Sequence, residues 1–220
     1  MNKRVNITLL GSILNFFLFG ISGLFAQTNY ATNSVLATGN WYKIGVVAEG
    51  IYKIDVPFLN NLGINTVNLP SNSIKMYGNG GAMLSEKNNN TDADDLVENA
   101  IEMNDGGDGV FNGNDYFIFY GASADKWSKD SVNKKFIHKK NLYSDTVFYY
   151  LTFGKNGRRI VTQPMVTGAN KFVSSYNERL FYEKDLVNFL NSGKEWLGEE
   201  FSNISSNSLT KNFNYTIDGL

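Results

Sequence analysis

The residues best suited to chemistry lie in one short stretch, residues 104–115, with the sequence NDGGDGVFNGND. Oxygen-bearing side chains recur there at the spacing of a calcium-binding loop, in which a glycine at the sixth position permits a sharp turn. With Gly109 at that position, the side chains that fall on ligand positions one, five, nine and twelve are Asn104, Asp108, Asn112 and Asp115. This pattern predicts a weak calcium site, because only two of the four ligands carry a charge.

The same stretch also fits a turn that binds no metal. Gly106 stands at position three and brings no side-chain oxygen, and Asp115 at position twelve is shorter than the usual bidentate glutamate. Asp, Asn and Gly are also the residues of tight turns, where side chains bond to the nearby backbone and glycine adopts positive φ. We favour the turn, and calcium stays as the alternative.

Other site chemistry has few residues to work with. The chain has no cysteine and one histidine, His138, so it offers no cysteine nucleophile, no thiolate metal site and no pair of imidazoles. No Gly-x-Ser-x-Gly motif presents a serine, and we interpret His138 as structural. The glutamates at 183, 195, 199 and 200 are better explained as a solvated charged face than as an acid–base pair. We therefore assign no catalytic residue and no certain cofactor, and these residues leave open whether this chain is an enzyme.

The first 26 residues have the pattern of a secretory signal peptide. Lys3 and Arg4 precede an apolar run that ends at Ala26, and cleavage is expected before Gln27. No later stretch is apolar and long enough to cross a membrane. Without Lys3 and Arg4, 18 basic residues face 21 acidic ones, a balance that argues against a nucleic-acid partner.

The elements that must position these residues are strands. Frequent aromatic and β-branched residues, many glycines and few prolines predict a mostly β fold: an antiparallel, sandwich-like domain over residues 27–220 with one or two short helices. Residues 41–55 read as a β-hairpin turning at Ala48-Glu49-Gly50, and residues 116–120 and 146–153 read as central strands. Residues 97–103 read as a strand with a helix as the competing interpretation, and residues 121–135 as a polar loop anchored by Trp127.

Helices and a last strand complete the prediction. Asp55 is placed to cap a short helix that Gly63 ends, and residues 182–190 fit a second helix ending at Gly193. Residues 155–161 read as an Asn-Gly hairpin, and residues 209–217 as a new strand without a partner. A strand that begins so near the end of the sequence predicts a truncated chain with an unpaired edge.

Four blocks of the sequence resemble the N-terminal region of the type IX secretion system sortases, the PorU family of gingipain-like cysteine peptidases. The blocks are residues 41–55, 74–84, 94–121 and 181–201, and their order and spacing also agree with that family. The resemblance runs across nearly all of residues 41–220. Its most specific part is SGKEWLGE at residues 192–199, where Lys194 stands in place of the more frequent arginine.

The resemblance implies a much longer parent protein in which a β-rich N-terminal region precedes a Cys/His catalytic domain. Such a protein acts at the outer membrane surface, removes C-terminal sorting domains from exported cargo and helps join the cargo to an anionic lipopolysaccharide. No catalytic motif of the family is present in this chain. The implied partners are the rest of the parent peptidase, outer-membrane components of the secretion system and cargo, with the domain in the periplasm or at the outer membrane surface.

A second hypothesis comes from a different class of protein. The chain would then be a free-standing secreted β-sandwich that binds a polysaccharide or a protein through exposed aromatic side chains such as Trp127. A Cys/His peptidase domain in the downstream reading frame would decide for the sortase hypothesis.

Overall fold

The structure is a computed structural model that describes residues 30–87, 93–168, 170–171, 174–175, 178–191, 195–204 and 208–216. The chain divides into two units, 1–37 and 38–220. The described part of the first unit holds one 3₁₀ turn, η1 (Val35–Ala37). The predicted signal peptide and its cleavage site lie outside the described residues. Among the described residues, no helix is long and apolar enough to span a bilayer.

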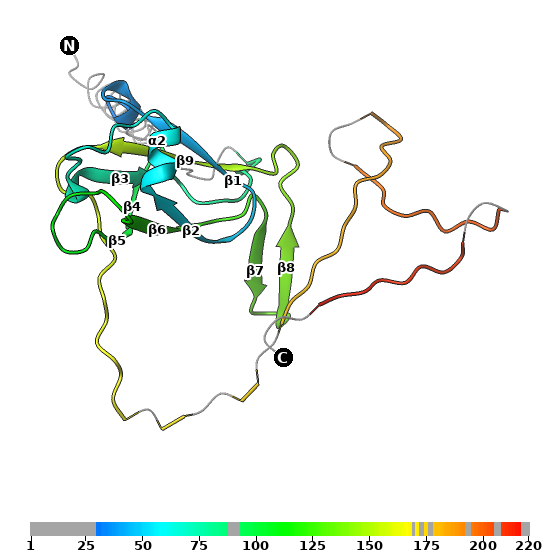
Figure 1. The fold of residues 1–220 in the computed structure, drawn as a ribbon. Helices are drawn as coiled ribbons and strands as arrows, with labels where there is room; N and C mark the ends of the chain where they lie inside the picture. Colours follow the sequence, from blue (N-terminus) through cyan, green and yellow to red (C-terminus); the bar gives the residue numbers. More distant parts are fainter. Residues whose placement is uncertain are drawn as a thin grey trace, which may run out of the picture. The chain divides into compact units, whose positions relative to one another are not determined.

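The second unit is built from antiparallel β-sheets (Figure 1), as the composition predicted. The four-stranded sheet has the order β1 (Tyr42–Val46), β9 (Val147–Phe153), β3 (Ile74–Tyr77), β4 (Glu98–Asn99). The three-stranded sheet has the order β2 (Gly50–Asp55), β6 (Tyr116–Gly121), β5 (Glu102–Asn104), and β7 (Lys126–Asp130) pairs with β8 (Lys135–Lys139) in a separate hairpin. The predicted central strands 116–120 and 146–153 do lie centrally, as β6 and β9.

The core forms between the four-stranded and three-stranded sheets. Alternate residues of their strands are buried, as period-2 burial of one sheet face requires. The fully buried side chains include Phe111, Phe117, Phe119, Ile74, Met76, Ile101, Leu151 and Val46. Phe119 of β6 and Tyr149 of β9 join the two sheets, with ring centroids 5.1 Å apart. We call these two sheets and the core between them the sandwich.

The predicted hairpin at residues 41–55 is wrong, although both of its strands exist. β1 pairs with β9 and β2 pairs with β6, so the chain crosses from one sheet to the other at residues 47–49. Gly50 does not have a positive φ, so the backbone does not make the three-residue turn that we expected. β9 and β6 pair along the full length of β1 and β2, and this non-local pairing replaces the local turn.

Residues 98–104 make a second crossing between the sheets. β4 pairs with β3 in one sheet, and β5 pairs with β6 in the other. Between them, Ile101 is fully buried and exchanges backbone hydrogen bonds with the 158–160 segment: its N–H donates to Arg158 O, and its O accepts from Ile160 N. The strand interpretation of 97–103 is therefore confirmed and the competing helix is wrong. Strands that switch sheets in this way form the corners of a sandwich.

The first predicted helix is present as α2 (Val56–Asn61). The Asp55 carboxylate accepts a hydrogen bond from Phe58 N, at 3.0 Å, and so caps one of the free N–H groups of the first turn. Pro57 lies in that first turn, and Gly63 follows the helix at φ 78°. Leu59 is fully buried, so the helix packs against the core.

Three other predictions of local structure are wrong. Residues 121–135 contain β7, whose Lys, Ser and Asp residues hid the strand; the Asp130 carboxylate accepts from Val132 N and Asn133 N and so stabilises the turn into β8. The sequence also predicts a strand at 73–77 and a tight Gly-rich turn at 78–81 that leads back into a strand at 82–84, but residues 82–84 form no strand. Asn156 makes a turn at φ 55°, but Arg159 then pairs in parallel with Ile101 instead of returning along β9.

The C-terminal part also differs from the prediction. Within the described residues after 160 there is no helix and no strand, only an isolated bridge between Val187 and Leu197. The second helix at 182–190 and the strand at 209–217 are therefore wrong over the residues that the structure describes, and Gly193 and Ile217 lie outside them. Apolar residues in this part have no ladder of partner strands to pair with.

Candidate functional site

The four predicted calcium ligands take part in separate local contacts. Asp108 Oδ1 accepts from Val110 N at 2.9 Å, and Asp115 Oδ2 accepts from Asn112 N at 2.8 Å. Asn104 Nδ2 donates to the hydroxyl of Tyr116 at 3.1 Å. The bonds of Asp108 and Asp115 are the short-range bonds by which Asp stabilises turns, whereas Asn104 bonds to its cross-strand partner on β6.

A fifth polar residue of the loop, Asp105, connects the loop to a distant part of the sandwich. Its carboxylate accepts from the hydroxyl of the buried Ser71 and from Gly107 N at 3.1 Å. The hydrogen bond from Ser71 and then that from Gly107 lower the pKa of Asp105 below its usual value. The calcium template passed over Asp105 because it falls on an even position. Nothing in the sequence next to it indicated a partner 34 residues away.

The backbone of this loop also has the conformation of a turn. Gly106, Gly107, Gly109 and Gly113 all have positive φ, between 57° and 86°. Within the described part of the chain, no group of three or more His, Cys, Asp or Glu side chains could hold a metal ion. Asn104 and Asn112 would bind calcium through amide oxygens, which lie outside this set of side chains, so calcium at the loop stays a prediction.

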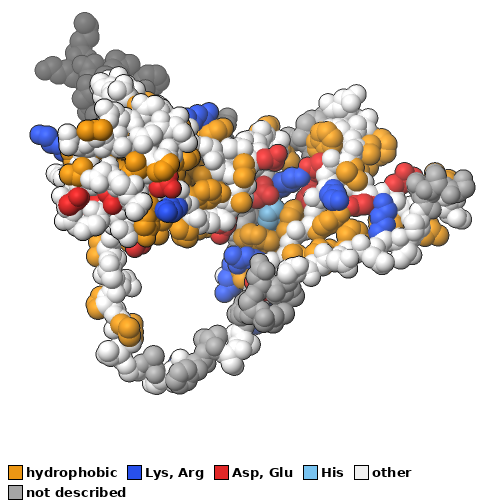
Figure 2. Space-filling model, in the orientation of Figure 1, with side chains coloured by type: hydrophobic (Ala, Val, Ile, Leu, Met, Phe, Trp, Pro, Cys, Tyr) orange, Lys and Arg blue, Asp and Glu red, His pale blue; other side chains and the backbone are white. Residues whose placement is uncertain are grey.

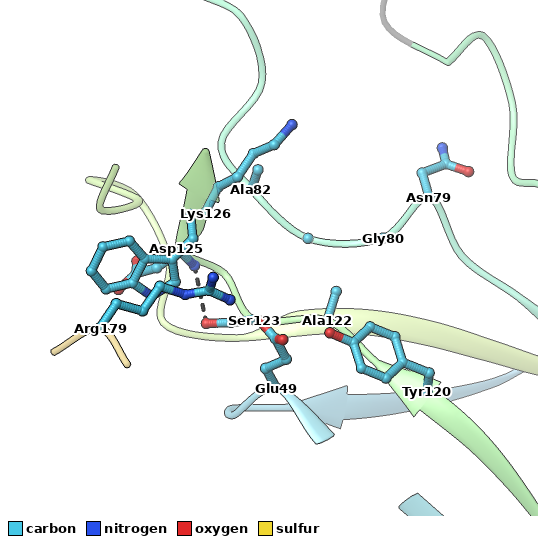
Figure 3. A pocket seen from close by; sticks show the side chains of 12 residues that line it. Glu49, Asn79, Gly80, Ala82, Tyr120, Ala122, Ser123, Asp125, Lys126 and Arg179 are labelled. Atoms are coloured by element: carbon cyan, nitrogen blue, oxygen red, sulfur yellow. Dashed lines mark hydrogen bonds between the residues drawn. The ribbon is translucent and has the colours of Figure 1, made fainter. Parts of the chain in front are cut away.

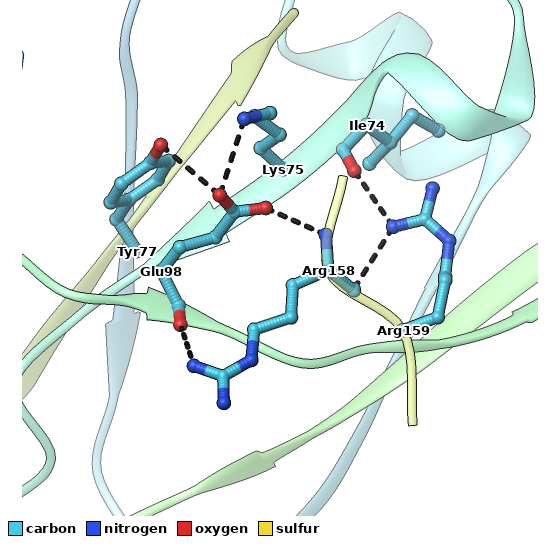
Figure 4. A network of polar contacts seen from close by, with 6 residues as sticks. All are labelled: Ile74, Lys75, Tyr77, Glu98, Arg158 and Arg159. Carbon is cyan, nitrogen blue, oxygen red and sulfur yellow. Dashed lines mark hydrogen bonds and ion pairs between the residues drawn. The ribbon is translucent and has the colours of Figure 1, made fainter. Parts of the chain in front are cut away.

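A polar network fixes the end of the sandwich (Figure 4). The Glu98 carboxylate bonds to Lys75 Nζ at 3.2 Å, accepts from Arg158 N at 2.7 Å and from the Tyr77 hydroxyl at 3.4 Å. Arg159 donates to Ile74 O at 3.1 Å. Burial, followed by the charge of Glu98, raises the pKa of Tyr77, whereas burial lowers the pKa of Arg159. The network satisfies backbone and side-chain groups within the fold, so we assign it a structural role.

An open cavity of about 440 Å³ lies beside the first crossing (Figure 3). The crossing contributes Glu49, the loop after β3 contributes residues 79–82, and the end of β6 and the start of β7 contribute most of the rest. The lining residues are Glu49, Asn79, Gly80, Gly81, Ala82, Tyr120, Ala122, Ser123, Asp125, Lys126, Trp127 and Arg179. Arg179 is the one member of this set that comes from the C-terminal part.

The wall of the cavity rests on a close backbone contact. A Cβ atom on Gly81 would lie 1.7 Å from Ser123 O, and the next residue, Ala82, donates its N–H to that same oxygen at 3.2 Å. Only glycine at position 81 allows the loop to approach the β6–β7 connection this closely. The Gly-Gly pair that we read as a tight turn therefore shapes a cavity wall.

The cavity has balanced charges and an aromatic side. Its carboxylates are Glu49 and Asp125, and its cations are Lys126 and Arg179. The hydrogen bond to Glu49, followed by burial, raises the pKa of Tyr120 to about 12. A small polar ligand would find hydrogen-bond donors, hydrogen-bond acceptors and the rings of Tyr120 and Trp127 here.

An aromatic cluster lies next to the cavity on the β7–β8 hairpin. Trp127 and His138 are cross-strand partners with ring centroids 4.8 Å apart, and Phe181 stacks on His138 at 3.6 Å. Asp125 Oδ2 lies 3.5 Å from His138 Nε2, while His138 Nδ1 is buried without a partner. Trp127 is thus an anchor, as predicted, and His138 has a structural environment. Its ring partner Phe181 could not be inferred from the sequence.

One of the predicted surface glutamates has a specific partner. Glu199 accepts a hydrogen bond from the hydroxyl of Tyr182. This bond lowers the pKa of Glu199 and raises the pKa of Tyr182 to about 12. The contact joins two exposed parts of the C-terminal segment, and it pairs the carboxylate with a phenol rather than with a second carboxylate.

Comparison with known proteins finds a likeness among solved structures. No family model matches the chain, and no curated protein matches it. The fold is a β-sandwich, and a similar solved structure is the crystal structure of dimeric latent PorU from Porphyromonas gingivalis. It is 28% identical over 56% of this chain, with a TM-score of 0.42. The chain spans 10% of the length of that protein, and at this TM-score the likeness establishes neither fold nor function.

Proposed function

We propose that this chain is the exported N-terminal β-domain of a type IX secretion sortase-type cysteine peptidase, and that it serves the parent protein as a non-catalytic brace or partner-binding domain. The observation that carries the proposal is where the family-like block 181–201 lies relative to the core. This block contains the most specific part of the resemblance, yet none of its described large apolar residues belongs to the core. Residues that resemble a family but do not close the fold are available for contacts outside it.

The exposures in this block are large. Phe189 is 77% exposed and Leu190 is 73% exposed, and Trp196, Leu197 and Phe201 are each between 45% and 53% exposed. Several large apolar side chains left exposed in one segment are the kind of surface that a partner can cover. The partner that the resemblance implies is the rest of the parent peptidase, with outer-membrane components and cargo as further partners. The domain would act in the periplasm or at the outer membrane surface.

The non-catalytic role follows from the residue content. A cysteine peptidase needs a thiolate nucleophile with a base beside it, and this chain has no cysteine. Removal of sorting domains from cargo would therefore belong to the whole parent protein. Purified residues 27–220 should show no peptidase activity. Turnover of a peptide substrate that survives His138→Ala and repurification would contradict this assignment.

The interaction role can be tested in the host. Replacing Phe189, Leu190 and Trp196 together by serine should leave the domain folded and cause exported cargo to keep its sorting domain. The matched control is Val132→Ser, which changes an 89% exposed residue in the β7–β8 turn, outside the family-like block. Normal cargo processing in the triple variant would rule out a role for this surface in the sortase.

The alternative, a free-standing secreted β-sandwich binding module, is favoured by a different observation. The open cavity combines Tyr120 and Trp127 with two carboxylates and two cations, which suits a neutral polyhydroxyl ligand such as a sugar. Titration with neutral oligosaccharides, followed by Trp127 fluorescence in a variant that lacks Trp41 and Trp196, would test this. Saturable binding that Tyr120→Ala abolishes would favour this module.

A further inference from the structure

Residues 179–185, which we call the strap, lie along one face of the β7–β8 hairpin. Alternate residues of an extended segment point to the same side. Arg179, Phe181 and Asp185 share that spacing, and all three contact the hairpin. Leu180, on the other side of the strap, is 55% exposed. The strap is therefore two-sided, with one side that contacts the hairpin and one that does not.

The hairpin presents a matching row of side chains in the same order. The guanidinium carbon of Arg179 lies 5.0 Å from the ring centroid of Phe136. Phe181 then stacks on His138 at 3.6 Å, with ring planes 25° apart, and Asp185 forms an ion pair with Lys140. Positions 136, 138 and 140 alternate along β8 and the residue just after it.

Trp127 completes this row from the neighbouring strand. It is the cross-strand partner of His138, and it lies 5.5 Å from the Arg179 guanidinium and 6.3 Å from the Phe181 ring. In Figure 2 the histidine, drawn pale blue, lies among hydrophobic and charged side chains. Cation–π contacts, ring stacking and one ion pair thus recognise three positions of the strap.

Side chains alone make this contact. Among the described residues, no backbone hydrogen bond joins the strap to β7 or β8. Every described residue from 161 to 175, in the segment that connects the strap to the sandwich, is exposed. A segment held only by side chains on an exposed tether can leave its site without disturbing the sandwich core.

Docking of the strap also changes the cavity. Arg179 is the cavity residue that the strap supplies, and the other lining residues lie between positions 49 and 127. When the strap leaves, Glu49 and Asp125 keep only Lys126 as a cation, and the cavity loses the part of its lining that Arg179 supplies. The position of the strap therefore sets both the charge and the lining of the cavity.

We propose that the face formed by Trp127, Phe136, His138 and Lys140 is a receptor for an extended peptide that carries a cation, an aromatic ring two residues later and a carboxylate four residues after the ring. The chain's own strap occupies this face reversibly. A partner segment with the same pattern displaces the strap and removes Arg179 from the cavity. This interaction goes beyond the proposed function and holds or fails independently of any sortase role.

The single histidine gives a direct readout of strap docking. Stacking against Phe181 places the His138 ring protons above an aromatic ring, which shifts their NMR resonances upfield. In the full chain at one fixed pH, Phe181→Ala should move these resonances downfield. Leu180→Ala, one residue away on the exposed side, should leave them in place. Unchanged resonances in Phe181→Ala, or equal shifts in both variants, would overturn the proposal.

Adding the strap as a separate peptide tests the receptor. A peptide of residues 178–190 contains no histidine, so it adds no signal to the His138 region. It should return the resonances of the Phe181→Ala chain to their wild-type positions. Because a tethered segment has an effective concentration on the order of millimolar, wild-type chain should bind the peptide at least roughly tenfold more weakly. Equal affinity for both chains, or equal binding of a peptide with alanine at position 181, would refute the receptor.

A charge exchange provides an independent check. Lys140→Asp should release the strap by placing like charges together, and it should shift the His138 resonances as Phe181→Ala does. Lys140→Asp combined with Asp185→Lys should restore the pair and the wild-type resonances. A double variant that stays in the released state would show that the ion pair does not select this register.

Discussion

Two regions of this chain are both rich in large apolar side chains but bury them very differently. In the sandwich, alternate residues of β1, β3, β6 and β9 close a core in which nine large side chains are less than 2% exposed. After residue 160, no described apolar residue is buried, and Phe189 and Leu190 are among the most exposed. Aromatic content alone therefore does not make a core.

The difference comes from strand pairing. Residues of the sandwich have partners on neighbouring strands, so their backbone groups are satisfied and one face of each sheet can be buried. The described residues 178–216 form one isolated bridge and no strand, and their aromatic side chains make local contacts such as Tyr182 with Phe213 at 4.8 Å. The first region stabilises the fold, and the second leaves its large apolar side chains on the surface.

The largest expected effect tests this difference directly. Phe117→Ala removes a fully buried ring that packs against Phe111, with centroids 6.0 Å apart. The lost burial and the cavity should lower the free energy of unfolding by about 3–5 kcal/mol. Phe189→Ala removes the same ring from an exposed position and should change stability by no more than about 0.5 kcal/mol. Urea denaturation of both variants measures the contrast, and similar losses would show that residues after 160 share the core.

A smaller effect is expected where the sandwich holds the start of the C-terminal part. A Cβ atom on Gly157 would lie 2.2 Å from Ile74 O, a backbone atom that can move only with β3. Gly157→Ala should therefore cost about 1–3 kcal/mol. Gly154→Ala is the matched control, because its Cβ would meet only the flexible end of Lys75 at 3.5 Å. Thermal melts would contradict the close contact if Gly154→Ala had a lower melting temperature than Gly157→Ala.

Much of the sandwich could be predicted because its signals are local. Short runs of apolar, β-branched and aromatic residues indicated β3, β6 and β9, and the capping residue Asp55 with Gly63 indicated α2. Pairing could not be predicted: β1 and β2 look like a hairpin in sequence, but β9, about a hundred residues away, provides a better partner for β1. The pattern of apolar residues predicts which face of a strand is buried, but it does not predict which strand lies beside it.

The candidate site was the less predictable part. Trp127 was expected to anchor its surroundings, and it does so. The strand that carries it, Lys126–Asp130, is largely polar, so no alternation of apolar residues indicates a strand there. The cavity needs Glu49, Tyr120 and Arg179 together, and these come from a crossing, a strand end and the strap. Such contacts depend on tertiary packing, so no spacing in the sequence could indicate them.

A pH effect should separate the carboxylates of the two regions. The Ser71 hydrogen bond lowers the folded-state pKa of Asp105, so its contribution to stability is present above the unfolded value of 3.8 and is lost as pH falls through the folded pKa. Asp105→Asn should be less stable than wild type at pH 7, and the gap should shrink as pH falls below 3.8. Glu199→Gln, in the exposed region, should leave global unfolding unchanged at both pH values. A gap for Asp105→Asn that is independent of pH would contradict this linkage.

The smallest expected effect concerns the loop at residues 104–115, where bound calcium would make the sandwich itself depend on a ligand. Three carboxylates of this loop already accept hydrogen bonds from backbone N–H groups: Asp105 from Gly107, Asp108 from Val110, and Asp115 from Asn112. A cation would have to compete with these bonds, and only Asp108 and Asp115 of the four predicted ligands carry charge. We therefore expect no calcium-dependent change in melting temperature, and a loss of stability in Gly109→Ala, because Gly109 has φ 79°. If the loop did bind calcium, a calcium concentration about a hundredfold above Kd would raise the free energy of unfolding by about 2.7 kcal/mol. If calcium produces that gain and Asp108→Ala removes it, the loop is a metal site and the sandwich is no longer stabilised by its core alone.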